Sequence, residues 1–136
     1  MRQSRTYVYK VLQSSWGIRI AITATAELQA GREEERLASD LPVWLAFAGS
    51  AAELSPLDKE RLAEGLSSVA FEVSRRVDGR PVTVTVGEVS YVESDFQIEG
   101  LSVAMCRWAE AEFNLPQRQI IESFDRVANR YLFDWQ

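Results

Sequence analysis

The sequence contains no histidine and only one cysteine, Cys106, among its 136 residues. Without histidine, the chain lacks the commonest general base and metal ligand and every Ser-His or Cys-His arrangement for nucleophilic catalysis. A single cysteine excludes an internal disulfide, as is typical of a reducing compartment. No apolar run approaches the roughly 20 residues of a membrane span, and the N-terminus lacks the apolar stretch of a signal peptide. We therefore expect a cytoplasmic protein without a membrane segment.

Other chemical motifs are also missing. Neither of the glycine-rich phosphate loops GxxxxGK[ST] and GxGxxG occurs. Cys106 lies in an apolar segment, so we interpret it as a buried small side chain, with a reactive thiol as the alternative. One acidic set lacks the spacing and central glycine of a calcium loop and is interpreted as solvated loop charge: Glu88, Glu93, Asp95 and Glu99. We expect no catalytic residue, no metal site and no cofactor.

Acidic residues outnumber basic ones by 20 to 15, which gives a formal net charge of -5. Nucleic-acid binders usually need a basic stripe, because neutralising phosphates supplies most of their affinity. The basic residues of the N-terminal segment form at best a modest patch: Arg2, Arg5, Lys10 and Arg19. This surplus of acidic residues argues against a nucleic-acid partner and favours a protein partner, in particular one with a basic surface. The run Glu33, Glu34 and Glu35 is either solvated charge or a contact for such a partner.

The first half of the chain carries strand patterns. Alternation over residues 7–12 and 18–26, separated by a turn that contains Gly17, predicts an antiparallel hairpin. The charged segment 31–41 is expected to be a short solvated helix or a mobile loop. Residues 43–48 form a short apolar run that predicts a buried strand, with a helical turn as the alternative, and Trp44 is expected in the core.

Helical and strand patterns then alternate. Ser55 and Pro56 are typical of a helix start, and helical spacing continues to Val77, before Gly79 ends the helix. Residues 82–91 predict a strand with a β-bulge at Gly87. Residues 100–114 predict a deeply buried helix, and 116–136 a last helix with an aromatic tail. Together these elements predict one α+β domain over residues 1–136. Its mixed four-stranded sheet, an N-terminal hairpin plus a β-α-β unit, carries two or three helices on one face.

Aromatic residues crowd the C-terminal segment: Tyr131, Phe133 and Trp135. They either fold back onto the core or form an exposed patch of the kind enriched at protein interfaces. Trp16, in the first turn, poses the same question. A homodimer formed through the last helix is compatible with the second reading.

Two runs resemble domain IV of elongation factor G and its ribosomal-protection relatives: LPVWLAFAGSAAELSPLDKERLAEGL (41–66) and DGRPVTVTVGEVSYVESDFQIEGLSVAMCRWAEAEF (78–113). In that family a strand, a glycine-containing loop, a helix, a Pro-Val-led strand and a second helix follow in this order. The resemblance covers about residues 18–114. It implies the same fold but does not carry over the family's function, because this chain has no GTPase motif, no histidine and an acidic balance.

Three functional hypotheses follow. The first is a non-enzymatic protein-interaction module, a small acidic accessory, inhibitor or immunity-type protein, whose contacts are the aromatic residues and glutamates named above. The second is a translation-associated factor with the domain IV-like fold. The third is a small-molecule-binding protein or enzyme with carboxylate and tyrosine chemistry in a helix–sheet cleft: Tyr91, Glu93, Asp95 and Arg107.

Overall fold

The computed structural model describes residues 3–136, which form a five-stranded sheet, three α-helices and a separate two-stranded sheet. The main sheet consists of β1 (Arg5–Leu12), β2 (Gly17–Glu27), β3 (Arg36–Ala38), β4 (Leu41–Phe47) and β5 (Val82–Tyr91). The helices are α1 (Pro56–Ser67), α2 (Ala70–Arg76) and α3 (Glu99–Glu112), and the small sheet pairs β6 (Ile120–Asp125) with β7 (Arg130–Trp135). Short 3-10 turns are η1 (Glu33–Glu35), η2 (Gly49–Glu53) and η3 (Glu93–Asp95). Arg2 of the predicted basic patch lies outside the described residues.

The main sheet has the order β1-β2-β5-β4-β3, in which only the β4–β5 pairing is parallel. The α+β class and the mixed sheet built from a hairpin and a β-α-β unit are therefore confirmed. The sheet has five strands instead of four, because the charged segment 31–41 contains η1 and the short edge strand β3. Three residues are too few to show a period of two in the sequence. Arg36 of β3 pairs with Trp44 of β4, and its guanidinium lies 5.1 Å from the indole centre.

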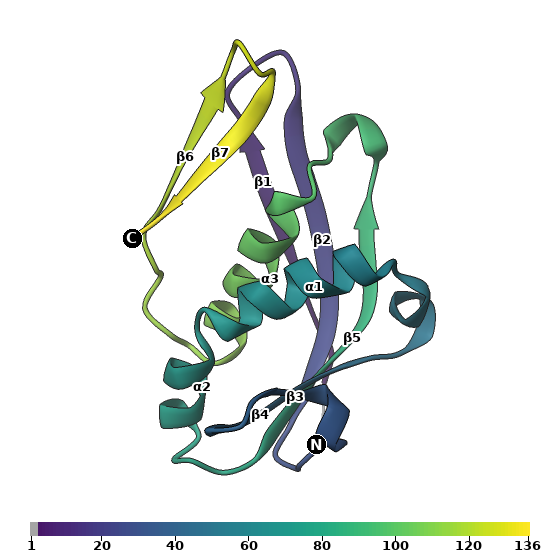
Figure 1. Ribbon diagram of the computed structural model, residues 1–136, viewed down its shortest axis with the longest axis vertical. Helices are drawn as coiled ribbons and strands as arrows, with labels where there is room; N and C mark the ends of the chain where they lie inside the picture. The colour runs from purple at the N-terminus through teal and green to yellow at the C-terminus, as the bar shows by residue number, and fades with distance from the viewer. Residues whose placement is uncertain (1–2) are drawn as a thin grey trace.

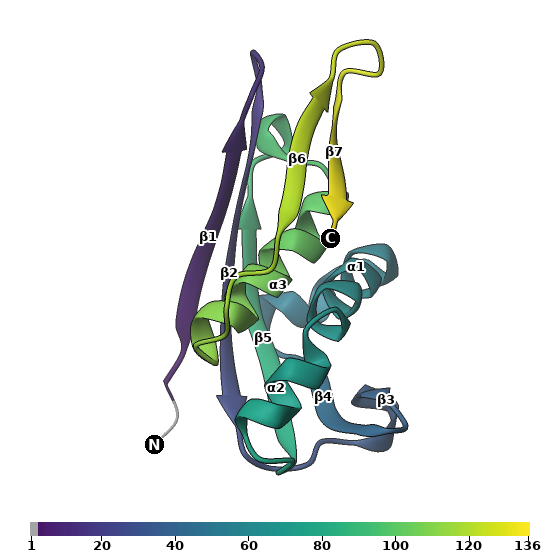
Figure 2. The same cartoon turned by 90° about the vertical axis from the view of Figure 1, so that its left-hand side faces the viewer.

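All three helices and the β6–β7 hairpin lie on the same face of the main sheet (Figures 1 and 2). The core fills the space between these two layers. Its sheet side includes Ile18, Ile20 and Ile22 of β2, all of which are buried. Trp44 of β4 is buried as well but lies outside this core, contrary to the prediction, because its neighbours Val43 and Leu45 face the core and its own ring lies against Arg36 of β3. No helix formed by residues 3–136 has the length and apolarity that crossing a bilayer requires.

The predicted β-bulge is confirmed at Gly87. Thr23 of β2 pairs with Glu88 of β5, whereas the next residue, Ala24, pairs with Val86. Gly87 is therefore the extra residue. Val84 and Val86 before the bulge are buried, and Val89 and Tyr91 after it still pack against the core although they follow the opposite alternation.

The helix predicted from residue 56 is divided into α1 and α2. The Ser55 side chain caps α1 by accepting from the Asp58 N–H at 3.2 Å, as its position predicts. Near the break, the Ser68 hydroxyl donates to the Gly65 carbonyl at 2.6 Å. Such back-bonding to the preceding turn often bends helices. Gly79 follows α2 with φ of 73°, a left-handed value that suits glycine.

The prediction of a C-terminal helix over 116–136 is wrong, and with it the basis for a homodimer formed through that helix. The segment is the β6–β7 hairpin, which pairs Phe124 with Tyr131 and Ile120 with Trp135. The Asp125 carboxylate accepts from the N–H groups of Val127 and Ala128, and Asn129 closes the turn with φ of 56°. Asp and Asn at these positions are a turn signal. Apolar residues on both sides of the turn also match helical spacing, which misled the prediction.

The β6–β7 hairpin is anchored on the β1–β2 hairpin at one end of the molecule (Figure 2). The Tyr131 hydroxyl donates to the Trp16 carbonyl at 2.7 Å and accepts from the Gln13 N–H at 2.9 Å. The Trp16 indole packs edge-on against Tyr131 and donates to the Asn129 side chain at 3.0 Å. Tyr9 of β1 donates to Glu122 of β6. Burial and this bond raise the pKa of Tyr9.

Removing the Tyr131 hydroxyl should destabilise the protein. The Tyr131→Phe variant leaves the Gln13 N–H and the Trp16 carbonyl without their partner, which should cost about 1–3 kcal/mol of unfolding free energy. Equilibrium urea unfolding measures it. Tyr7→Phe is the matched control, because Tyr7 of β1 is half-buried and its hydroxyl makes no hydrogen bond within residues 3–136. Equal losses from the two variants would contradict this account of the anchor.

Candidate functional site: a groove between β7 and helices α1 and α3

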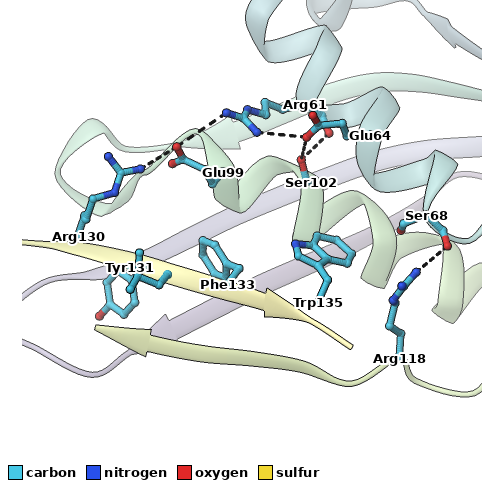
Figure 3. A pocket seen from close by; sticks show the side chains of 11 residues that line it. Arg61, Glu64, Ser68, Glu99, Ser102, Arg118, Arg130, Tyr131, Phe133 and Trp135 are labelled. Atoms are coloured by element: carbon cyan, nitrogen blue, oxygen red, sulfur yellow. Dashed lines mark hydrogen bonds and ion pairs between the residues drawn. The ribbon is translucent and has the colours of Figure 1, made fainter. Parts of the chain in front are cut away.

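A groove of about 530 Å³ runs between β7 and the helices α1 and α3. Aromatic side chains of β7 form one side of it, and charged side chains of the helices form the other (Figure 3). Its lining is contributed by Arg61, Glu64, Ser68, Glu99, Ser102, Arg118, Arg130, Tyr131, Leu132, Phe133 and Trp135. Four separate parts of the chain thus meet here: α1, α3, the segment before β6, and β7.

The helical wall is a chain of ion pairs. Glu99, at the start of α3, contacts Arg130 through Oε2 at 2.7 Å and Arg61 at 3.9 Å. Arg61 also pairs with Glu64 at 3.2 Å, and Glu64 accepts from the Ser102 hydroxyl at 3.1 Å. Burial opposes ionisation of Glu99, but hydrogen bonds from its own N–H and Gln97, with Arg130, lower its pKa overall. Glu99 is thus ionised at neutral pH.

Arg118 marks the other end of the groove. Its guanidinium donates to the Ser68 carbonyl at 2.7 Å and to the Gln136 main-chain oxygen at 3.2 Å, and lies 5.5 Å from the Trp135 ring centre. Within residues 3–136 it has no Asp or Glu partner, unlike Arg61 and Arg130. A guanidinium has five N–H donors, so Arg118 keeps donors for a ligand.

A buried carboxylate holds the chain that carries Arg118. Glu110 of α3, 5% exposed, accepts from the Arg118 backbone N–H at 2.6 Å and from the Arg107 guanidinium at 2.8 Å. Arg107 also donates to the Arg118 carbonyl at 2.8 Å. Both main-chain groups of Arg118 are therefore fixed to α3, which places its side chain at the groove.

The structure separates the predicted contact residues into two groups. All three aromatic residues of β7 border the groove, but only Phe133 and Trp135 are partly exposed there, whereas Tyr131 is 1% exposed and its ring belongs to the core. Trp16 is half-buried and packs against Phe124 and Tyr131. Glu33, Glu34 and Glu35 form η1, next to β3 and away from β7 (Figure 1). They do not contribute to the groove.

The charged residues of the groove were missed by sequence reasoning. Helical spacing places Arg61 and Glu64 on the solvent side of the helix predicted from residue 56, and Arg118 on the solvent side of the helix predicted over 116–136. They approach β7 only because residues 116–136 form a hairpin over the helical layer. The turn-forming residues Asp125 and Asn129 were the one feature of the sequence that indicated this hairpin.

The residues proposed for small-molecule chemistry are not brought together. Tyr91 stacks on Phe96, with ring centres 3.8 Å apart, whereas Arg107 is engaged by Glu110. Asp95 lines a different hollow, beside the β1–β2 turn. Across residues 3–136, no three acidic or cysteine side chains gather in a metal-binding group.

Cys106 is completely buried, as predicted. Burial raises the pKa of its thiol to about 11, so little of the reactive thiolate forms at neutral pH. We predict very slow reaction of the native protein with Ellman's reagent at pH 8 and rapid reaction of one thiol per chain after denaturation. Equally rapid reaction in both states would show that the thiol is accessible.

No protein family profile and no curated protein matches the sequence. A solved crystal structure from Thermus thermophilus has a similar fold, with a TM-score of 0.51 and 16% identity over 77% of this chain. The chain spans only 14% of that protein's length. Such low identity shows the fold alone. It does not connect the chain to elongation factor G, so that resemblance stays a prediction.

Proposed function

We propose that this protein is a non-enzymatic interaction module that binds a segment of a partner protein in the groove between β7 and helices α1 and α3. The observation that carries the proposal is the composition of the groove. Aromatic rings and arginines converge there, and these are the residue types that dominate binding energy at protein interfaces.

The shape of the groove supports a chain segment as its occupant. It extends along β7 from Arg130 at one end to Arg118 at the other (Figure 3). Its two ends are charged and its middle is aromatic, which suits a segment with both apolar and polar groups. The net charge of -5 favours a partner that also has a basic surface outside the bound segment. Glu33, Glu34 and Glu35 provide a separate contact for that surface. We place this activity in the cytoplasm.

A blocked groove tests the proposal. A random linear peptide library displayed on phage is selected against the full chain, and the selected peptides are measured against Glu64→Trp. The Glu64 side chain is 55% exposed, so an indole can enter the groove without disturbing the core. Binding should fall at least about tenfold, an amount that corresponds to ~1.4 kcal/mol.

The control is Glu60→Trp, the same change one helical turn earlier, at an exposed position outside the groove. It should leave binding unchanged. Failure to select any peptide, or equal binding by both variants, would reject the groove as the interaction site.

A translation-associated factor is the second proposal. The order of β4, α1, β5 and α3 matches the order of elements in domain IV of elongation factor G, which supports it. The similar fold in the Thermus protein forms a small part of a much larger chain. Co-sedimentation with ribosomes at low salt tests this role, and absence from the ribosomal fraction would remove it.

A further inference from the structure

The outer edge of β7 presents unpaired main-chain groups to the groove. The Gln136 N–H donates to the Gln119 carbonyl at 3.1 Å, so these two residues form a hydrogen-bonded pair. Such pairs alternate along an antiparallel ladder. Leu132 and Asp134 therefore bond to β6, whereas the intervening residues direct their N–H and C=O groups outward: Tyr131, Phe133 and Trp135.

One part of this edge is already occupied by a side chain that imitates a strand. The Gln97 amide accepts from the Tyr131 N–H at 2.8 Å and donates to the Tyr131 carbonyl at 2.8 Å. Gln97 lies just before α3, so this edge faces the helices and the groove. The corresponding groups of Phe133 and Trp135 have no hydrogen-bond partner within residues 3–136. The free edge thus begins where the Gln97 amide ends.

The free edge leads to Arg118. Trp135 is the last residue of β7, and the Arg118 guanidinium lies over its ring. From Phe133 to Trp135 the free edge spans about 7 Å, the length of two extended residues. A short strand along β7 would therefore bring a carboxylate within reach of the one groove arginine that has no Asp or Glu partner among the described residues.

We propose that the groove recognises an extended peptide by strand addition. The peptide pairs with the outer edge of β7 at Phe133 and Trp135 and places a carboxylate on Arg118. This inference rests on the proposed function and specifies its ligand class. Main-chain bonds supply affinity in this mode, and the charged end fixes the register. The carboxylate belongs either to an Asp or Glu side chain or to a peptide C-terminus.

N-methylation of the selected peptide tests the strand pairing. The peptide returned by the phage selection is resynthesised with one N-methyl group at each position in turn. Methylation of an N–H that faces β7 removes a hydrogen bond and introduces a clash, so affinity should fall at least about tenfold. Methylation of the neighbouring residues should change affinity less than about threefold. We therefore expect a large loss of affinity at every second methylated position of the peptide.

The carboxylate is tested with Arg118→Gln. Binding of the carboxylate peptide should weaken about tenfold, and binding of its neutral amide analogue should not change. Unchanged binding of the neutral analogue also shows that the variant is folded. Arg76→Gln, at an exposed arginine on α2, should bind like the unmodified protein. Two kinds of peptide identify the source of the carboxylate. One has an amidated C-terminus and an internal Asp or Glu, and the other has a free C-terminus and no Asp or Glu.

The outcomes separate this inference from the proposed function. A peptide that binds in the groove but loses affinity without a two-residue period on methylation, or binds Arg118→Gln unchanged, would overturn strand addition. The proposal of an interaction module would then still hold. Selection of no peptide at all would overturn both. Sedimentation that shows the chain to be a dimer, dissociated by Glu64→Trp, would overturn the peptide as occupant in favour of a second copy.

Discussion

Replacing Gly65 by alanine is expected to destabilise the protein by about 2–3 kcal/mol, although alanine is the better helix former by about 1 kcal/mol. A Cβ at Gly65 would lie 2.2 Å from the Ser102 carbonyl oxygen and 2.9 Å from the Met105 Cβ. The nearest of these atoms is backbone, so α1 and α3 must separate. Since both helices line the groove, peptide binding should weaken as well. Urea unfolding measures the loss of stability.

Gly100→Ala is the matched control in α3. Its added Cβ would also be close to neighbours, but these are the side-chain ends of Ile20 at 3.1 Å and Ile18 at 3.3 Å. Such methyl groups can move by a few tenths of an ångström. We expect a change within about 1 kcal/mol, because better helix propensity offsets the crowding. Equal destabilisation by both variants would contradict the close approach of α1 and α3 at Gly65.

Replacing Glu110 by alanine is expected to cost about 3–5 kcal/mol. Arg107, whose side chain is 11% exposed, would lose its carboxylate and remain as an uncompensated buried charge. The Arg118 N–H would lose its acceptor at the same time. The segment that positions Arg118 should therefore loosen, and the carboxylate peptide should bind more weakly even at temperatures where the variant is folded.

Glu112→Ala provides the comparison on the same helix. Glu112 pairs with Arg5 at 2.8 Å, but both side chains are solvent-accessible, 24% and 48% exposed. Exposed pairs of this kind contribute about 0–1 kcal/mol. A Glu110→Ala variant no less stable than Glu112→Ala would show that the buried network does not hold this part of the chain.

Helices, strands and their boundaries could be predicted where a single local sequence pattern dominated. Ser55 and Gly79 marked the limits of the α1–α2 region, and the change of parity at Gly87 predicted the bulge. The break near Ser68 could not be predicted, because apolar spacing continues from Leu66 to Val69 across it. At the break the Ser68 hydroxyl donates to the Gly65 carbonyl, a contact that spacing does not reveal.

The groove was beyond sequence reasoning for a different reason. Its charged wall depends on contacts between residues far apart in the chain, such as Glu99 with Arg130. Phe133 and Trp135 were identified as interface candidates from composition alone. Their partners across the groove became visible only once residues 116–136 were known to form a hairpin. The apolar residues of this segment fit both a strand alternation and helical spacing. Tertiary contacts such as that of Gln97 with Tyr131 favour the strand.

Amide hydrogen exchange at β7 in the free protein, followed by NMR, reads the strand edge directly. We predict slow exchange for Leu132 and Asp134, which bond to β6, and for Tyr131, which bonds to Gln97. The amides of Phe133 and Trp135 should exchange at least about tenfold faster and become protected when the selected peptide is added. Equal protection of all five amides in the free protein would contradict an open strand edge, and with it the strand-addition site.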